Sequence, residues 1–214
     1  MWWDMAPEMR AEFEDWHSHE HFPERMAIPG FQRGSRWADV EGGEGFFVLY
    51  EMAEYQTLTS TPYLERLNNP TPWSTRMMPH HRNMVRSQCR VLESFGSVTG
   101  GFLATLRLSP QDDQDEALRS HLRQTLGELP ATPGSTGGHL LRTDTPAAQQ
   151  TQEQKIRGGD TAADWIALVS GYDQAALRSL MAERFNPETL SDAKPAQGLS
   201  LFRLSFTMTP ADLK

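Results

Sequence analysis

Apolar positions in the first half of the chain follow the periods of helices and strands in turn. Met9, Phe13 and Trp16 recur at helical spacing after Pro7, which predicts a helix. Pro23 is expected to limit this helix, because proline pushes the preceding residue away from helical geometry. The other elements predicted here are a strand at 2–5, a short helical piece after Pro23, hairpin strands at 31–40 and 46–52, a helix at about 58–67 and a strand near 84–93.

The same order of elements is predicted again after residues 97–101, which read as a linker. A polar, Gln-rich stretch at 147–160 is expected to be a mobile loop between two hairpin strands. The elements predicted for this half are a strand at 102–108, a helix at 112–129, the hairpin strands at 139–143 and 165–170, a helix at 174–185 and a strand at 199–208.

Two copies of a β-α-β-β-α-β order predict an α+β protein of two ferredoxin-like units, at residues 1–98 and 99–214. Such a unit places its helices on one face of the sheet and leaves the other face bare. Two bare faces can be buried against each other, so we expect the halves to form a barrel within one chain.

Composition narrows the classes of partner. The 214 residues carry a net charge of −8, which argues against nucleic-acid binding. No apolar run is long enough to span a membrane, and residues 1–4 lack the basic start of a secretory signal. A single cysteine, Cys89, fits a reducing compartment. We therefore expect a cytoplasmic monomer or homodimer that binds a small molecule, without nucleic-acid or membrane partners.

Basic residues gather between positions 66 and 92, where five arginines occur without any acidic residue. The two-residue period of the strand predicted at 84–93 places Arg86 and Arg90 on one face. If that face lines the barrel, these arginines require an anion from the protein or from a substrate. The alternative is that they are surface residues paired with carboxylates elsewhere.

Residues 16–31, WHSHEHFPERMAIPGF, resemble the EthD-like branch of the dimeric α/β-barrel superfamily. In that branch an aromatic residue and a His-Pro-type segment follow the first strand, and a Pro-Gly-aromatic turn leads into the second. Residues 63–67 and 70–73 also look similar to members of the branch. The resemblance covers most of the first half, and the second half only by element order, so the chain looks like a tandem form of a fold that usually completes its barrel by dimerisation.

The resemblance carries the family's His before Phe-Pro onto His21 and its upstream aromatic residue onto Trp16, whereas His17 departs from the family pattern. The superfamily contains cofactor-free monooxygenases, muconolactone-type isomerases, polyketide cyclases and haem enzymes. The resemblance therefore supports the fold better than a particular reaction.

The residues around His21 have the chemistry of a proton carrier. His17 and His21 are four residues apart, so they share one face of a continuous helix, with Glu20 beside them. Imidazole is the usual proton shuttle near neutral pH. We expect His21 to be the general base or acid and Glu20 or His17 to be its partner. The alternative is a polar helix end with no catalytic role.

Metal and cofactor motifs are weak. His17-Ser18-His19-Glu20-His21 matches the H-x-x-E-H pattern of a zinc peptidase group, but Pro23 interrupts the helix and no downstream acidic ligand is identifiable. His80 and His81 could line a pocket mouth, ligate haem iron or lie in a surface loop; no C-x-x-C-H motif is present. We expect no metal and no cofactor.

The sequence thus predicts a cofactor-independent enzyme that does acid–base chemistry on a small aromatic or apolar carboxylate or carbonyl compound. Isomerisation, cyclisation, lyase chemistry and monooxygenation are all compatible with a proton-carrying His21. Substrate-binding residues expected from the sequence are Trp16, Arg86, Arg90, His80 and His81. The alternatives are a non-catalytic small-molecule binding or accessory protein of the same fold and a haem-dependent enzyme.

Overall fold

The computed structural model describes residues 1–147, 149–194 and 197–213, and the chain divides into two compact units. The first unit comprises Met1–Gln88, Thr145–Ala162 and Ser205–Lys214, and the second comprises Cys89–Asp144 and Ala163–Leu204. A stretch from the middle of the sequence and the C-terminal stretch thus belong to the first unit. No helix in the described residues is long and apolar enough to cross a membrane.

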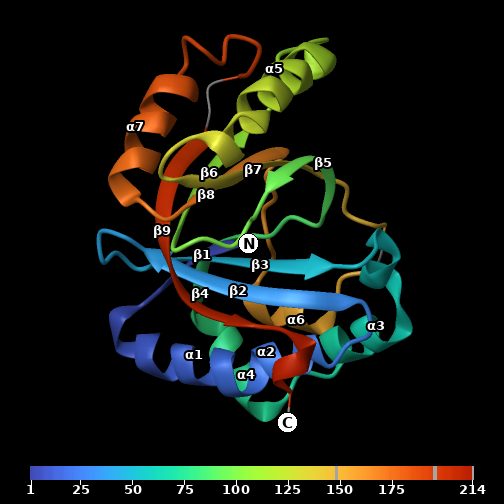
Figure 1. Ribbon diagram of the computed structural model, residues 1–214. Helices are drawn as coiled ribbons and strands as arrows, with labels where there is room; N and C mark the ends of the chain where they lie inside the picture. The colour runs from blue at the N-terminus through green and yellow to red at the C-terminus, as the bar shows by residue number, and fades with distance from the viewer. Residues whose placement is uncertain (148, 195–196, 214) are drawn as a thin grey trace. The chain divides into compact units, whose positions relative to one another are not determined.

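The first unit contains an antiparallel sheet with helices packed on it (Figure 1). Its strands follow the order β4-β1-β3-β2, and the last residues of β9 lie beside β2, where the Thr207 hydroxyl bonds to Gly34 and Ser35. The elements are β1 (Trp2–Met5), α1 (Arg10–Trp16), α2 (Phe22–Met26), β2 (Phe31–Asp39), β3 (Gly45–Met52), α3 (Thr61–Asn68), α4 (Pro72–Met77), β4 (His81–Val85), α6 (Gln152–Arg157) and β9 (Gln197–Met208).

Alternation along β1 and β3 builds the core of this unit. Trp3 of β1 pairs in register with Phe46 of β3, and both side chains pack with Phe13 and Trp16 of α1. All four are nearly inaccessible to solvent. Burial of such large side chains contributes roughly 1.5–3 kcal/mol each. The helical segment that carries His17 and His21 is therefore held firmly against the sheet.

The helical segment continues through Pro23, so the prediction that Pro23 limits it was wrong. Residues His17–His21 form a π turn, in which the Phe22 amide donates to the carbonyl of His17 five residues earlier. Pro23 then lies in the first turn of α2, where its fixed φ suits the helix and its missing N–H is best tolerated. π turns inside helices are frequent at functional sites.

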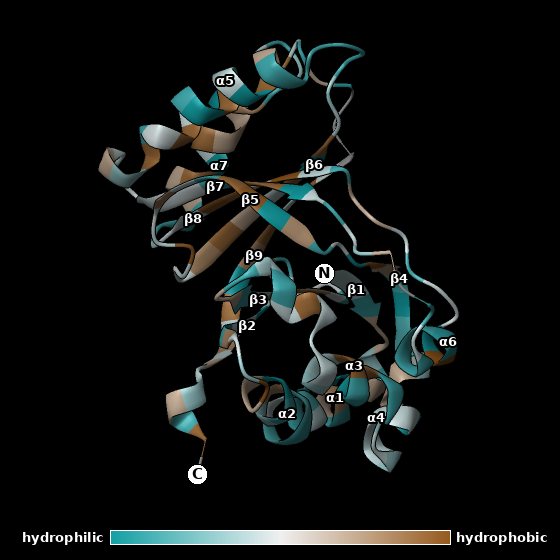
Figure 2. Cartoon of the chain, turned by 90° about the vertical axis from the view of Figure 1, so that its right-hand side faces the viewer, coloured by the Kyte–Doolittle hydropathy of each residue, from teal (hydrophilic) through white to brown (hydrophobic). Residues whose placement is uncertain are grey.

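The second unit repeats the arrangement of strands. Its order is β9-β6-β8-β7-β5, all pairs being antiparallel. Leu118, Leu122 and Leu126 of α5 are fully buried, and β8 is buried at every position. Figure 2 shows apolar colours over much of this sheet, with a hydrophilic band on β5. The elements are β5 (Cys89–Gly96), β6 (Phe102–Leu108), α5 (Asp115–Gly127), β7 (Ser135–Thr143), β8 (Trp165–Gly171), α7 (Gln174–Arg184) and the first residues of β9.

The α+β class predicted from the periodicity is confirmed. In the first unit β1 to β4 follow the order fourth-first-third-second. In the second unit β6 to β9 follow the same order, and β5 is added beside β7. The predicted strands at 2–5 and 102–108 have the observed bounds of β1 and β6.

Three predicted elements were wrong. The strand expected near 84–93 is two strands, because β4 pairs with β1 and ends at Val85, whereas β5 begins at Cys89 and pairs with β7. The helix expected at about 58–67 is a 3₁₀ turn at Tyr55–Thr59 followed by α3. The stretch expected to be a mobile loop contains α6; residue 148 of that stretch lies outside the described residues.

Candidate functional site

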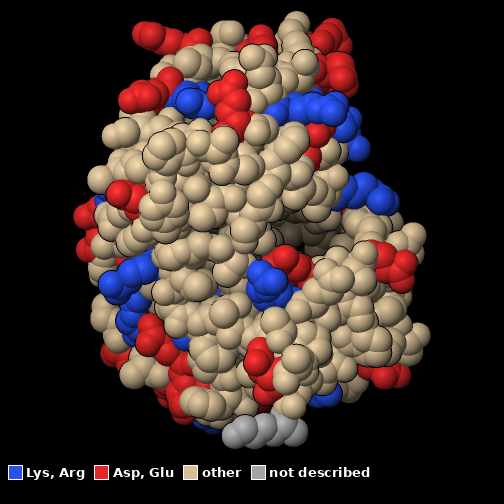
Figure 3. Space-filling model, in the orientation of Figure 1, with Lys and Arg blue, Asp and Glu red and all other residues tan. Residues whose placement is uncertain are grey.

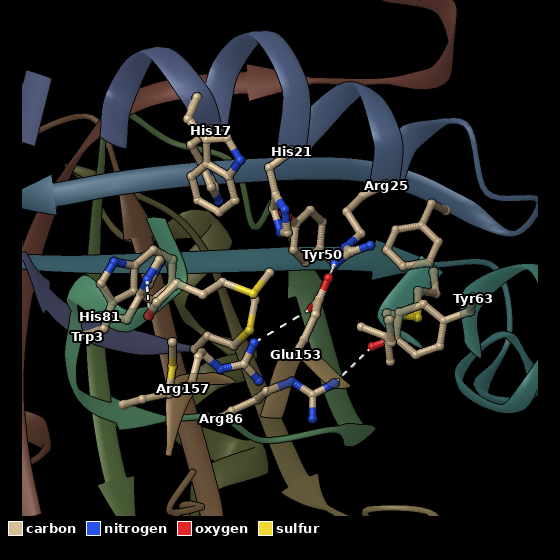
Figure 4. Close-up of a pocket in the computed structure, with 17 residues that line it drawn as sticks. Trp3, His17, His21, Arg25, Tyr50, Tyr63, His81, Arg86, Glu153 and Arg157 are labelled. Atoms are coloured by element: carbon tan, nitrogen blue, oxygen red, sulfur yellow. Dashed lines mark hydrogen bonds and ion pairs between the residues drawn. The ribbon is translucent and has the colours of Figure 1, made fainter. Parts of the chain in front are cut away.

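A pocket of about 60 Å³ lies within the first unit (Figure 4). Its walls come from the helical segment 10–26, the strands β1, β2, β3 and β4, and the helices α3 and α6. Aromatic side chains from five of these elements line it: Trp3, Trp16, Phe31, Tyr50 and Tyr63. Such a lining suits an apolar or aromatic ligand.

His17 and His21 point into this pocket from the π turn (Figure 4). Their rings stack, with centroids 5.2 Å apart and planes inclined by 22°. The predicted sharing of one helix face is thus confirmed. The Trp16 ring lies 4.7 Å from the His21 ring, between ring centroids. His81, at the start of β4, also lines the pocket, and the centroid of its ring lies 5.1 Å from that of the Trp3 ring.

The three imidazoles are neutral at neutral pH. Burial, reinforced by nearby Arg36, lowers the pKa of His17 well below its ordinary value, and burial with nearby Arg25 does the same for the pKa of His21. Burial, with Arg157 nearby, lowers the pKa of His81 to about 4. A neutral imidazole keeps one nitrogen lone pair, so each ring can accept a proton.

Five residues that line the pocket each carry a polar atom that is buried without a hydrogen-bond partner among the described residues. Burying a donor or acceptor unsatisfied costs about 1–3 kcal/mol. Five such residues around one small space indicate a site built for a polar ligand or for bound water. The atoms are Trp3 Nε1, His17 Nδ1, His21 Nδ1, Arg25 Nη1 and the Tyr50 hydroxyl.

A buried ion pair joins the helical segment to α6. Arg25 Nη2 lies 2.5 Å from Glu153 Oε1, and both side chains are at most 5% exposed. Arg157 lies 3.7 Å from the same carboxylate and 2.8 Å from Asp160. Burial is the largest single influence on the pKa of Arg25 and lowers it, but Glu153, Tyr50 and Tyr63 together raise the pKa above its ordinary value, so the guanidinium stays charged.

Glu20 does not take the role predicted for it. Its carboxylate accepts hydrogen bonds from Trp16 Nε1 (3.0 Å), Thr71 Oγ1 (2.5 Å) and Ser74 Oγ (3.3 Å). Glu20 therefore ties the start of α4 to α1, and no bond from Glu20 to His21 occurs among the described residues. The i,i+4 spacing that brings His17 and His21 together turns the residue just before His21 to another side of the helix.

Arg86 and Arg90 lie in different units, so the prediction that they share a sheet face was wrong. Arg86 follows the end of β4, lines the pocket and donates to the Tyr63 hydroxyl over 2.9 Å. Arg90 belongs to β5, is half-exposed, and pairs with Asp144 over 2.5 Å. Of the two adjacent histidines, His81 lines the pocket and His80 does not.

The pocket also contains residues that were not predicted from the sequence, chiefly Arg25, Tyr50, Glu153 and Arg157. The signal for α6 was present: Thr151 and Gln154 form a capping box, in which each side chain bonds the backbone N–H of the other. Nothing local, however, relates Glu153 to Arg25, which lies 128 residues earlier.

No group of three or more His, Cys, Asp or Glu side chains within residues 1–147, 149–194 and 197–213 is arranged to hold a metal ion. In the H-x-x-E-H segment the two histidines face the pocket, whereas Glu20 is engaged by Trp16 and Thr71. The geometry expected for a zinc peptidase is therefore not formed by this segment.

Acid is expected to destabilise the protein through these histidines. Their pKa values are lower in the folded state than the ordinary 6.5, so the unfolded state binds more protons once the pH falls below 6.5. Stability should be fully present above pH 6.5 and fall by up to about 1.4 kcal/mol per pH unit for each histidine below it. Thermal unfolding between pH 7.5 and 5 measures this slope. His81→Asn should make the slope of stability against pH shallower. An equal slope in this variant would contradict the lowered pKa of His81.

Comparisons with known proteins support the fold. No family model matches the chain, and no curated protein matches it in sequence. Among solved structures, a "putative monooxygenase" of Fusobacterium nucleatum aligns over 97% of this chain and 91% of its own, with a TM-score of 0.61 and 5% identity.

Two further solved structures are similar. A "putative monooxygenase" of Lactobacillus acidophilus covers 98% of this chain and 93% of its own length, at a TM-score of 0.59 and 11% identity. An "anthrone oxidase-like protein" aligns over 100% of this chain and 92% of its own, with a TM-score of 0.65 and 13% identity. At these identities the likeness concerns the fold alone.

Proposed function

We propose that this chain is an enzyme of the monooxygenase-type α/β-barrel fold, built from two ferredoxin-like units at about residues 1–98 and 99–214. We further propose that it oxidises a small, enolisable aromatic carbonyl compound in the pocket around His21, without an added cofactor. The single observation that carries this proposal is that five residues lining a pocket with aromatic walls each carry a buried polar atom without a partner among the described residues.

His21 is proposed as the general base. Its neutral ring can take a proton from a carbon next to the substrate carbonyl, which leaves an enolate. Because the lowered pKa also makes imidazole a weaker base, the step needs help from groups that stabilise the enolate. Arg25 supplies a positive charge beside His21, and buried charges act strongly where water is excluded.

The enolate then supplies the electrons for oxygen chemistry. A methylene group and O₂ yield a carbonyl group and one molecule of water: two C–H bonds are lost, one oxygen atom enters the product and the other leaves as water. All four electrons come from the substrate, so no external reductant is required. His17 and His81 are themselves neutral and line the pocket with His21, and Trp3 and Trp16 provide faces for the ring.

Oxygen uptake by purified protein tests the proposal. The compounds to use are anthrone, because of the similar fold of the anthrone oxidase-like protein, and the single-ring keto acid phenylpyruvate. We expect catalytic O₂ consumption above the enzyme-free rate with at least one of them. Substrate loss without O₂ uptake would overturn the oxygenase proposal in favour of an isomerase, cyclase or lyase. A Soret band in the protein's absorption spectrum would overturn it in favour of haem chemistry.

A further inference from the structure

The charges around the pocket do not balance. Arg25, Arg86 and Arg157 line it, whereas the carboxylates that pair with them are Glu153 and Asp160. Arg86 donates a hydrogen bond to the neutral Tyr63 hydroxyl. Three guanidinium groups against two carboxylates leave one excess positive charge beside the pocket, on the partly exposed Arg86, and this charge favours an anionic ligand over a neutral one.

We propose that the pocket binds a small planar organic monoanion, a single-ring aromatic carboxylate or enolate, and that Arg25 and Tyr50 hold its negative end. This inference rests on the proposed function, since it concerns the same pocket. It assigns the anion-binding role to two residues that the sequence did not single out.

Arg25 is positioned for this role by Glu153. A guanidinium has two donor edges, and Glu153 occupies Nη2 and thereby fixes the plane of the group. Nη1 is buried and has no partner among the described residues. In Figure 4 the Arg25 side chain enters the pocket beside Tyr50. A carboxylate or enolate oxygen is the acceptor that such a donor binds most strongly.

Tyr50 supplies the second donor. Burial raises the pKa of its phenol, so the hydroxyl keeps its proton and can donate to an anion. The Tyr50 oxygen is also buried without a partner in the described part of the chain. The phenol comes from β3 and the guanidinium from α2, so two rigid elements fix the positions of the donors.

The size and lining of the pocket limit the organic part of the ligand. A volume of about 60 Å³ is well below the roughly 150 Å³ of a cavity that admits benzene. Met52, Met78 and Met84 line the pocket, and methionine side chains adapt readily to a ligand. A single ring can therefore be accommodated by movement of these side chains. The aromatic walls favour such a ring over a fully polar anion such as inorganic phosphate.

Binding of matched probes to the full-length protein tests the inference. Phenylacetate and phenylacetamide differ chiefly in charge, and calorimetry or quenching of tryptophan fluorescence can report their affinities. Phenylacetate should bind at least about tenfold more tightly than the amide, and inorganic phosphate should bind more weakly than phenylacetate. Equal affinity for the acid and the amide, or tighter binding of phosphate, would overturn the proposal.

Two variants locate the interaction. Tyr50→Phe removes only the hydroxyl, so it should fold normally and weaken phenylacetate binding about tenfold; Tyr172→Phe, at a residue that is 66% exposed, is the matched control and should leave binding unchanged. The double variant R25M/E153Q removes both buried charges together and should weaken binding about 100-fold. Unchanged affinity in Tyr50→Phe would exclude the assigned hydroxyl and overturn the proposed pair of donors.

The same probes separate this inference from the proposed function. If phenylacetate binds through Tyr50 but no oxygen uptake depends on His21, the catalytic proposal fails and the anion site stands. If His21 is essential for turnover but the amide binds as tightly as the acid, the anion site fails and the catalytic proposal stands.

Discussion

Replacement of Glu153 by alanine is expected to lower the free energy of unfolding by about 3–5 kcal/mol. The substitution leaves the Arg25 guanidinium buried without its carboxylate, and it also removes a nearby charge from Arg157. Neither arginine side chain is more than 8% exposed, so water cannot readily replace the lost partner. The loss should exceed the value of the ion pair itself, because most of it comes from the uncompensated buried charge.

Glu44→Ala is the matched control for this prediction. Glu44 lies in the same unit and pairs with Arg82, but both side chains are nearly half exposed. Figure 3 shows charged side chains of both signs interspersed over one face of the molecule. The Glu44 carboxylate is well solvated, so its removal should lower the free energy of unfolding by no more than about 1 kcal/mol. Urea unfolding compares the two variants. Equal losses in Glu153→Ala and Glu44→Ala would show that the Arg25–Glu153 pair does not anchor α6.

The sequence predicted what local periodicity determines. Alternating apolar residues located β1 and β6, and the four-residue spacing brought His17 and His21 onto one face. Trp16, His21, Arg86 and His81 line the pocket, and their roles in binding and catalysis stay predictions.

Local periodicity and composition do not predict contacts between residues that are far apart in the sequence. Residues 147–160 have the polar composition typical of a loop. They nevertheless contain α6, which is stabilised by tertiary contacts, chiefly Glu153 with Arg25 and Gln152 with Asn68. Composition cannot show that a polar segment has a buried partner far away in sequence. Pro23 was misjudged for a related reason, because a π turn that packs against the sheet allows helical geometry to continue into α2.

Replacement of His21 by alanine is expected to reduce turnover by about 10²–10⁴-fold, the usual contribution of a positioned acid or base. His21 borders the pocket with 8% of its surface exposed, and its Nδ1 has no partner among the described residues. Since the substitution breaks no hydrogen bond at this nitrogen, we expect the far-ultraviolet circular dichroism spectrum to match that of the unaltered protein.

His19→Ala provides a control from the same π turn. His19 is exposed and bonds to Asp15, so its removal alters the turn without touching the pocket. The rate of O₂ uptake by His19→Ala should equal that of the unaltered protein within about a factor of two.

The proposed role of His21 as the general base is tested most directly by the initial rate of O₂ uptake. The rates of His21→Ala and His19→Ala are compared at saturating concentrations of the most rapidly oxidised compound. His21→Ala alone should lose at least about 100-fold in rate. If His21→Ala keeps more than about one tenth of the original rate while folded, His21 is not the base and the claim is contradicted.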